Sequence, residues 1–144
     1  MTALSFSIPG QPVPYQRVAS SGRQRFTAPR SRAYMRSVGL HTVQAVARAK
    51  RAGITWPTDA RYAVTLVVVN GDRRARDLDN VAKNLDGATG VLWADDSQIW
   101  CLRVIRAEPD KARPRLVVHV AAVSADWLAL TAQPFLAPVG SGVV

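Results

Sequence analysis

Residues 73–83 read RRARDLDNVAK, and residues 93–97 read WADDS. The chain has only ten acidic residues against nineteen Lys and Arg, yet these two short segments hold four of the ten: Asp77, Asp79, Asp95 and Asp96. Two tight pairs of carboxylates in a basic protein indicate a site for a hard cation. Mg²⁺ is the candidate, because it takes one or two protein carboxylates, keeps several waters and binds substrate phosphates.

Basic residues lie next to the first acidic pair. Arg73, Arg74 and Arg76 precede it, and Lys83 follows one helical turn after Asp79. Arginine holds phosphate through paired hydrogen bonds, and a lysine can stabilise negative charge that develops during phosphodiester cleavage. The segment therefore predicts a metal-dependent site that acts on a phosphate.

Spacing suggests how the two acidic pairs come together. Asp77 and Asp79 follow a β-branched run at residues 62–69, and in an extended segment residues i and i+2 point the same way. Asp95 and Asp96 come just before a second predicted strand at residues 99–107. If the two strands are neighbours, both pairs meet at one end of the sheet.

Each part of this pattern also has a purely structural interpretation. Asp79 is a possible helix cap, and Asp79–Lys83 has the i,i+4 spacing of an ordinary helical ion pair. Residues 95–97 suit a turn. An EF-hand fits poorly, because the sixth loop position lacks Gly and the twelfth lacks Glu. No nucleophilic triad is evident, so hydrolysis would depend on the metal.

Composition narrows the class of protein. The formal charge of +9 and a pI near 11.0 indicate a polyanionic partner. The single Cys101 excludes an internal disulfide, and a buried inert thiol is expected. No segment is apolar enough to suggest a signal peptide or a membrane span, so we expect a cytoplasmic protein.

The chain order predicts one α+β domain. Strands are expected at residues 4–8, 62–69, 99–107 and 116–123, and helices at residues 31–51 and 79–87. Ser31 is the expected cap of the first helix, whose core face would carry Tyr34, Val38, His41, Ala45 and Ala49. The order β-α-β-α-β-β predicts a mixed sheet with two helices on it. The domain spans residues 1–123, and residues 124–144 form a tail that is surface-packed or partly disordered.

Residues 16–32 are polar and strongly basic, and no acidic residue occurs before Asp59. They favour a flexible arm that follows DNA phosphates over a merely solvated loop. Together with Arg73, Arg74 and Arg76, the expected DNA-binding residues are Arg17, Arg23, Arg25, Arg30 and Arg32.

The sequence RDLDNVAK at residues 76–83, then Asp86, then WADDSQI at residues 93–99 resembles the RusA family of Holliday junction resolvases. The resemblance covers residues 4–123 and implies a RusA-like fold. The segment between Lys83 and Trp93 is about two residues shorter than is usual in the family, and it reads Asp86-Gly87-Ala88 where the family commonly has Asp-Ala-Leu.

The resemblance implies a function. Family members are Mg²⁺-dependent homodimers that cut four-way DNA junctions by paired symmetrical nicks; Mn²⁺ is an alternative ion. It implies metal binding by Asp77, Asp79 and Asp96, an essential Lys83, and Asp95 as an adjacent acid or alternative ligand. It also implies a bacterial cytosolic or nucleoid location, or a phage origin. Two other functions remain open: a metal-dependent nuclease for other branched DNA, and a non-catalytic basic DNA-binding module.

Overall fold

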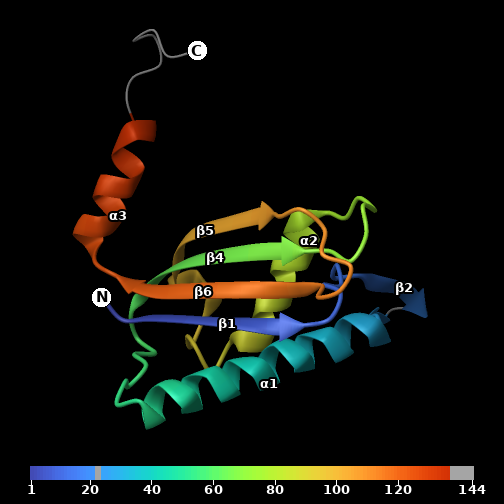
Figure 1. The fold of residues 1–144 in the computed structure, drawn as a ribbon, viewed down its shortest axis with the longest axis horizontal. Coiled ribbons are helices and arrows are strands. Elements are labelled where there is room, and N and C mark those ends of the chain that lie inside the picture. The colour runs from blue at the N-terminus through green and yellow to red at the C-terminus, as the bar shows by residue number, and fades with distance from the viewer. Residues whose placement is uncertain (22–23, 137–144) are drawn as a thin grey trace, which may run out of the picture.

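The computed structural model describes residues 1–21 and 24–136, with the backbone alone for residues 17–21 and 24–26. Its centre is a four-stranded sheet in the order β1-β6-β4-β5 (Figure 1). The strands are β1 (Ala3–Pro9), β4 (Arg61–Val69), β5 (Ile99–Arg106) and β6 (Arg115–Val123). β6 pairs antiparallel with β1 and β4, whereas β5 runs parallel to β4. The predicted α+β fold with a mixed sheet is confirmed.

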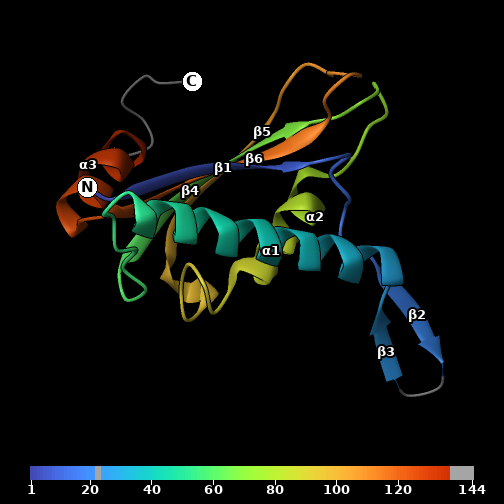
Figure 2. The same cartoon turned by 60° about the horizontal axis from the view of Figure 1, so that its bottom comes forward.

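One face of the sheet forms the core. Alternation places Leu4, Phe6 and Ile8 of β1 on this face, and Tyr62, Val64 and Leu66 of β4 lie beside them across β6. Both main helices cover this face (Figure 2). The opposite face carries smaller and more polar residues and faces away from the helices. Buried residues therefore alternate along β1 and β4, as the alternation of apolar residues in the sequence predicts.

Helix α1 (Pro29–Arg51) covers the β1 side of the sheet. It begins at Pro29 and not at Ser31, because proline already has the φ of a first helical residue. Ser31 is instead buried, where its hydroxyl accepts a hydrogen bond from the Gln16 N–H at 2.9 Å. The predicted core face is correct except for His41. Thr42 is buried instead, and its hydroxyl donates a hydrogen bond to the Val38 carbonyl at 2.7 Å.

The second predicted helix divides into two short elements. α2 (Leu78–Ala82) continues directly into the 3₁₀ helix η1 (Lys83–Ala88), so the α-helix ends earlier than predicted. Asp79 is not the cap: the N-cap is Asp77, and its side chain makes no capping hydrogen bond. A Cβ on Gly87 would clash with the carbonyl oxygen of Met35, and one on Gly39 would lie 2.9 Å from the Gly87 oxygen. The two glycines thus let α1 and η1 pack closely.

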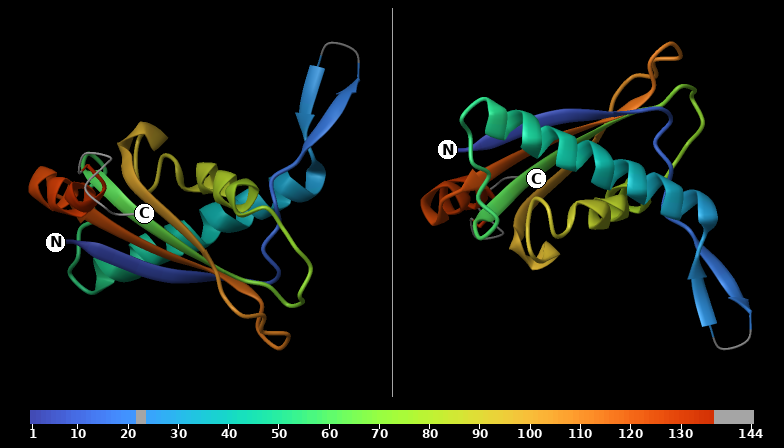
Figure 3. Two further views of the ribbon diagram at one scale, coloured as in Figure 1. Left: turned by 90° about the horizontal axis from the view of Figure 1, so that it is seen from above. Right: turned by 90° about the horizontal axis from the view of Figure 1, so that it is seen from below.

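The predicted basic arm contains a β-hairpin, formed by β2 (Arg17–Ser21) and β3 (Gln24–Thr27). The hairpin projects from the body at the start of α1 (Figure 3). Its base is fastened by the Gln16–Ser31 hydrogen bond and by a 3.1 Å bond from the Ala28 N–H to the Gln16 carbonyl. From the sequence we expected a flexible arm and predicted no strands in it, whereas the backbones of these two short segments pair as a hairpin.

After β6 the chain forms α3 (Ala125–Ala132) and the 3₁₀ helix η3 (Gln133–Phe135). Ser124 caps α3 by accepting a hydrogen bond from the Trp127 N–H at 3.1 Å. The sequence predicted no helix here, since polar and apolar residues do not alternate in this segment with the period of an amphipathic helix. Residues 137–144 of the predicted tail lie outside the described residues. Among the described residues, none of the helices combines the length and the apolarity that crossing a bilayer requires.

Candidate active site

Helix α2 separates two pockets. Asp79 and Lys83 line one pocket, and Asp77 and Asn80 line the other. Side chains three or four residues apart share a helix face, whereas residues two apart point about 200° away from each other. The helix therefore sends the two aspartates of the first acidic pair to different sides.

The first pocket, here called the acidic pocket, has a volume of about 670 Å³. It contains the carboxylates of Asp79, Asp86 and Asp96 together with Lys83. The rest of the wall is apolar and comes from α2, η1 and β5: Ala82, Leu85, Ile99, Leu102 and Val104. Carboxylates, a lysine and an apolar wall in one pocket provide the charges that phosphodiester hydrolysis needs.

The acidic residues do not meet in the way the sequence suggested. β5 is parallel to β4, with Ile99 beside Tyr62, so the start of β5 lies at the start of β4 and not at its end. Asp77 and Asp79 follow the end of β4. Asp79 and Asp96 nevertheless line one pocket, because α2 and η1 run back along the sheet face toward the start of β5.

In the turn before β5, the Asp95 side chain is held by a hydrogen bond, whereas Asp96 lines the acidic pocket. Asp95 Oδ1 accepts a hydrogen bond from the Ser97 N–H at 2.8 Å, and that N–H lowers the pKa of the Asp95 carboxyl. Gln98 completes the turn, since its Oε1 accepts from the Ala94 and Asp95 N–H groups at 2.8 and 3.0 Å. Asp95 thus caps the short helix η2 (Asp96–Gln98), as the turn interpretation predicted.

Gln98 also connects this turn to the rest of the fold. Its Nε2 donates to the carbonyls of Thr58 and Ala60, both at 3.0 Å, at the entrance to β4. Just before the turn, Trp93 is fully buried and lies beside Tyr62, with ring centroids 5.8 Å apart. The segment that carries Asp96 is therefore held by buried and hydrogen-bonded neighbours.

Lys83 is held by Asn80 and not by Asp79. Its Nζ donates to Asn80 Oδ1 at 3.0 Å, and Asn80 Nδ2 donates to Asp77 Oδ2 at 3.2 Å. Among the described residues, Lys83 and Asp79 form no ion pair, so the simple helical pair considered from the sequence is absent. Asn80 consequently links the lysine of the acidic pocket to the aspartate across the helix.

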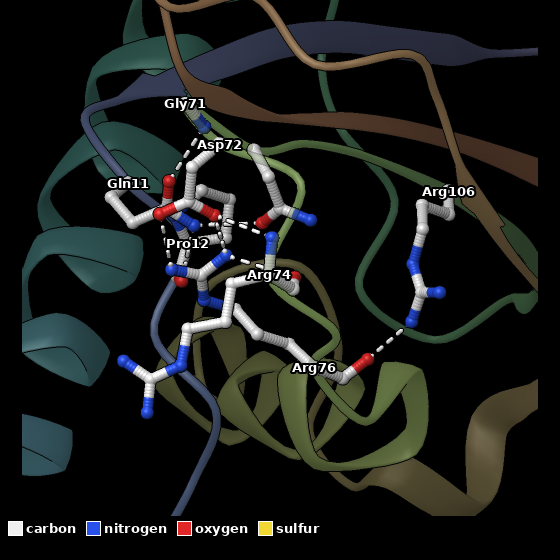
Figure 4. Close-up of polar contacts among 8 residues, drawn as sticks. Gln11, Pro12, Gly71, Asp72, Arg74, Arg76 and Arg106 are labelled. Carbon is white, nitrogen blue, oxygen red and sulfur yellow. Dashed lines mark hydrogen bonds and ion pairs between the residues drawn. The ribbon is translucent and has the colours of Figure 1, made fainter.

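The second pocket, here called the arginine pocket, has a volume of about 380 Å³. Its wall contains four arginines, which are Arg30, Arg74, Arg76 and Arg106. Asp77 is the acidic residue in the same wall. Arg76 donates to both oxygens of Asp72 at 2.7 and 3.2 Å, which raises the pKa of Arg76 and lowers that of Asp72. Arg106 reaches the Arg76 carbonyl from the other side (Figure 4).

The remaining predicted DNA-binding residues are placed as follows. Arg32 is exposed on α1, and Arg73 forms an exposed 3.8 Å ion pair with Glu108. Arg17 and Arg25 lie in the hairpin strands, and Arg23 lies outside the described residues. The prediction omitted Arg106 and Asp86. The spacing Lys83-x-x-Asp86 was a signal for Asp86, whereas nothing local to Arg106 marked it.

Mg²⁺ needs oxygen ligands, which carboxylates of the acidic pocket would have to provide together with a substrate phosphate. Within residues 1–21 and 24–136, no three His, Cys, Asp or Glu side chains are close enough together to hold an ion. The predicted set of Asp77, Asp79 and Asp96 is therefore not assembled in one chain. Asp79 and Asp96 line one pocket, and two protein carboxylates are enough for Mg²⁺ when a substrate phosphate supplies further oxygens.

Comparison with known families gave one match. The family model described as Endodeoxyribonuclease RusA matches residues 9–121, a range that contains every residue lining both pockets and excludes α3. A search of the curated proteins found no match.

Proposed function

The chain belongs to the RusA family of endodeoxyribonucleases, and we propose on this premise that it resolves four-way DNA junctions by paired nicks that depend on Mg²⁺. The observation that carries the proposal is the acidic pocket, where Asp79, Asp96 and Lys83 lie together beside four arginines across α2. A non-catalytic DNA-binding module would need the arginines but not this pocket.

Asp79 and Asp96 would hold the ion, with Asp86 near them in the same wall. A bound Mg²⁺ supplies Lewis-acid polarisation of a phosphate and lowers the pKa of a bound water. Asp95 is occupied as the cap of the turn, so its contribution would be to keep Asp96 in position.

Lys83 would stabilise the charge that appears on the phosphate during the reaction. Lys83 lines the acidic pocket, and its ammonium group donates one hydrogen bond to Asn80, which leaves two donor hydrogens for phosphate oxygens. Asn80 would orient it, because that side chain is itself held to Asp77 at 3.2 Å. The arginines would bind neighbouring phosphates, which gives affinity with little base preference.

Metal dependence is the first test. Cleavage of a branched DNA is expected with Mg²⁺ or Mn²⁺ and is expected to disappear in EDTA, because carboxylates alone cannot neutralise the reacting phosphate. The measurement is the amount of nicked strand on a denaturing gel, with restored activity after excess Mg²⁺ as the control. Undiminished cleavage in EDTA would contradict the proposal.

The active form is proposed to be a C2 homodimer. An open four-way junction has near two-fold symmetry and needs two opposed nicks, while the described part of one chain offers a single Lys83-containing pocket. The apolar face of α1 is not available as a contact surface, because it is buried against its own sheet. The tail remains, with Leu130, Phe135 and Leu136 exposed. β5 is a third candidate, with Trp100 and Ile105 exposed outside the acidic pocket.

Light scattering of the purified protein at micromolar concentration tests this assembly. We expect the mass of two chains, both free and on a four-way junction. The mass of one chain per junction, together with efficient paired nicking, would be incompatible with the symmetry argument. The proposed location is the bacterial cytosol or nucleoid, where junction DNA occurs.

A further inference from the structure

The arginine pocket has an excess of positive charge that its own contacts do not neutralise. Four arginines and one aspartate line it, and three separate parts of the chain supply the arginines: the start of α1, the loop after β4 and the end of β5. Of these arginines, Arg76 alone forms an ion pair among the described residues, and its partner is Asp72, which is not part of the pocket wall. The pocket is thus suited to an anion.

Its walls are held in place without a ligand. The Tyr15 N–H donates to the Asn80 carbonyl at 2.8 Å, which fastens the segment after β1 to α2. Arg106 donates to the Arg76 carbonyl, which fastens the end of β5 to the loop. The Asp72 carboxylate accepts hydrogen bonds from the Arg76 guanidinium, and the Arg76 backbone carbonyl accepts one from Arg106. The guanidinium groups of Arg76 and Arg106 are therefore held in place before a ligand binds (Figure 4).

The dimensions limit what the pocket can take. About 380 Å³ is near the lower end of the range for ligand pockets, which is roughly 300–1,000 Å³. One nucleotide fits such a volume, whereas a base-paired segment does not. Guanidinium groups bind phosphate through paired hydrogen bonds, and the Asn80 and Gln16 amides in the wall are polar enough to face a sugar or a base edge.

The position of the pocket relates it to the acidic pocket. Asp77 and Asn80 line the arginine pocket, while Asp79 and Lys83 line the acidic pocket; Asn80 and Asp79 are on α2, and Asp77 and Lys83 flank it. A strand that placed one phosphate beside Lys83 would therefore bring a neighbouring nucleotide to the arginine pocket across α2.

We propose that the arginine pocket binds one nucleotide of the DNA strand through phosphates other than the one that is cut, with Arg106 and Arg74, whose guanidinium groups point to different sides of the pocket (Figure 4), as ligands of the two phosphates that flank it. The proposal rests on the proposed nuclease function. It adds Arg106, which lies 23 residues beyond Lys83 in the sequence, and a specific place for a single unpaired nucleotide next to the nick.

The test is titration of the purified protein with thymidine 3′,5′-bisphosphate in EDTA, followed by calorimetry. Arg106→Gln and Arg74→Gln are each expected to weaken binding about tenfold or more, because each removes charge-assisted hydrogen bonds to phosphate. Arg103→Gln is the matched control. Arg103 is on β5 three residues before Arg106, is exposed, and points to the opposite face of the sheet. Unphosphorylated thymidine is expected not to bind.

Two results would overturn the proposal: no binding of the bisphosphate by the parent protein, or an equal loss in the Arg103→Gln protein. Circular dichroism shows whether Arg106→Gln has folded, and if it has not, Arg74→Gln decides, since no side-chain partner of Arg74 is present among the described residues. The titration requires no cleavage. Junction cleavage without bisphosphate binding would reject this proposal alone, and bisphosphate binding without cleavage would reject only the nuclease function.

Discussion

A protein that carries Asp79→Asn is expected to bind four-way junctions at least as tightly as the parent and to cut them roughly a thousand times more slowly. Asn preserves the shape of the side chain but removes the charge that attracts the cation, and a catalytic metal contributes several kcal/mol to the transition state. Binding is expected to hold or to tighten, because a carboxylate without a metal repels phosphate. Asp96→Asn, in the same pocket, is expected to behave alike.

Single-turnover cleavage and gel-shift titration measure the two quantities separately. Asp126→Asn is the control: it removes the same charge from the exposed first turn of α3, outside the family match. Full cleavage by the Asp79→Asn protein would mean that the acidic pocket is not the site of the reaction. A lower melting temperature with normal cleavage would assign Asp79 a structural role.

Lys83→Ala is expected to slow cleavage by about 10²–10³-fold, the usual loss when one donor to a developing oxyanion is removed. Its effect on affinity and on thermal stability is expected to be small. Among the described residues, the Lys83 side chain donates one hydrogen bond, to Asn80, and forms no ion pair. The rate of cleavage and the melting temperature, measured on the same preparation, separate the two roles.

Lys111→Ala is the matched control, since it removes a lysine that is exposed in the turn before β6. It is expected to leave the cleavage rate unchanged. If Lys83→Ala spared cleavage and lowered the melting temperature instead, Lys83 would be a structural residue of α2. If both variants slowed cleavage equally, the effect would be one of overall charge.

The sheet was predictable because burial is the dominant requirement at its core face. Leu4, Phe6 and Ile8 alternate with exposed positions, and the β-branched run of β4 is buried at every second residue. The hairpin β2–β3 was not predicted, since its two strands are only five and four residues long. The early end of α2 had one signal in the sequence, because Gly87 stands where the RusA family commonly has Ala; in the structure Gly87 approaches α1 closely.

The structure brings Asp79, Asp96 and Lys83 to one pocket but places Asp77 in the other. The argument for Asp77 and Asp79 assumed an extended chain, in which residues two apart point the same way. The helix begins at Leu78, so the two carboxylates are turned to opposite sides of α2. Arg106 was missed because only the pairing of β5 with β4 brings it near the loop that carries Arg76.

The central claim is that the acidic pocket cuts branched DNA, and cleavage of a synthetic four-way junction tests it most directly. The assay uses the full chain, Mg²⁺, strand-specific end labels and a linear duplex of the same sequence as the control. We predict nicks at symmetrically related positions in two opposed strands of the junction, and an uncut duplex. A junction that stays intact in Mg²⁺, or a duplex that is cut at the same rate, would contradict the account.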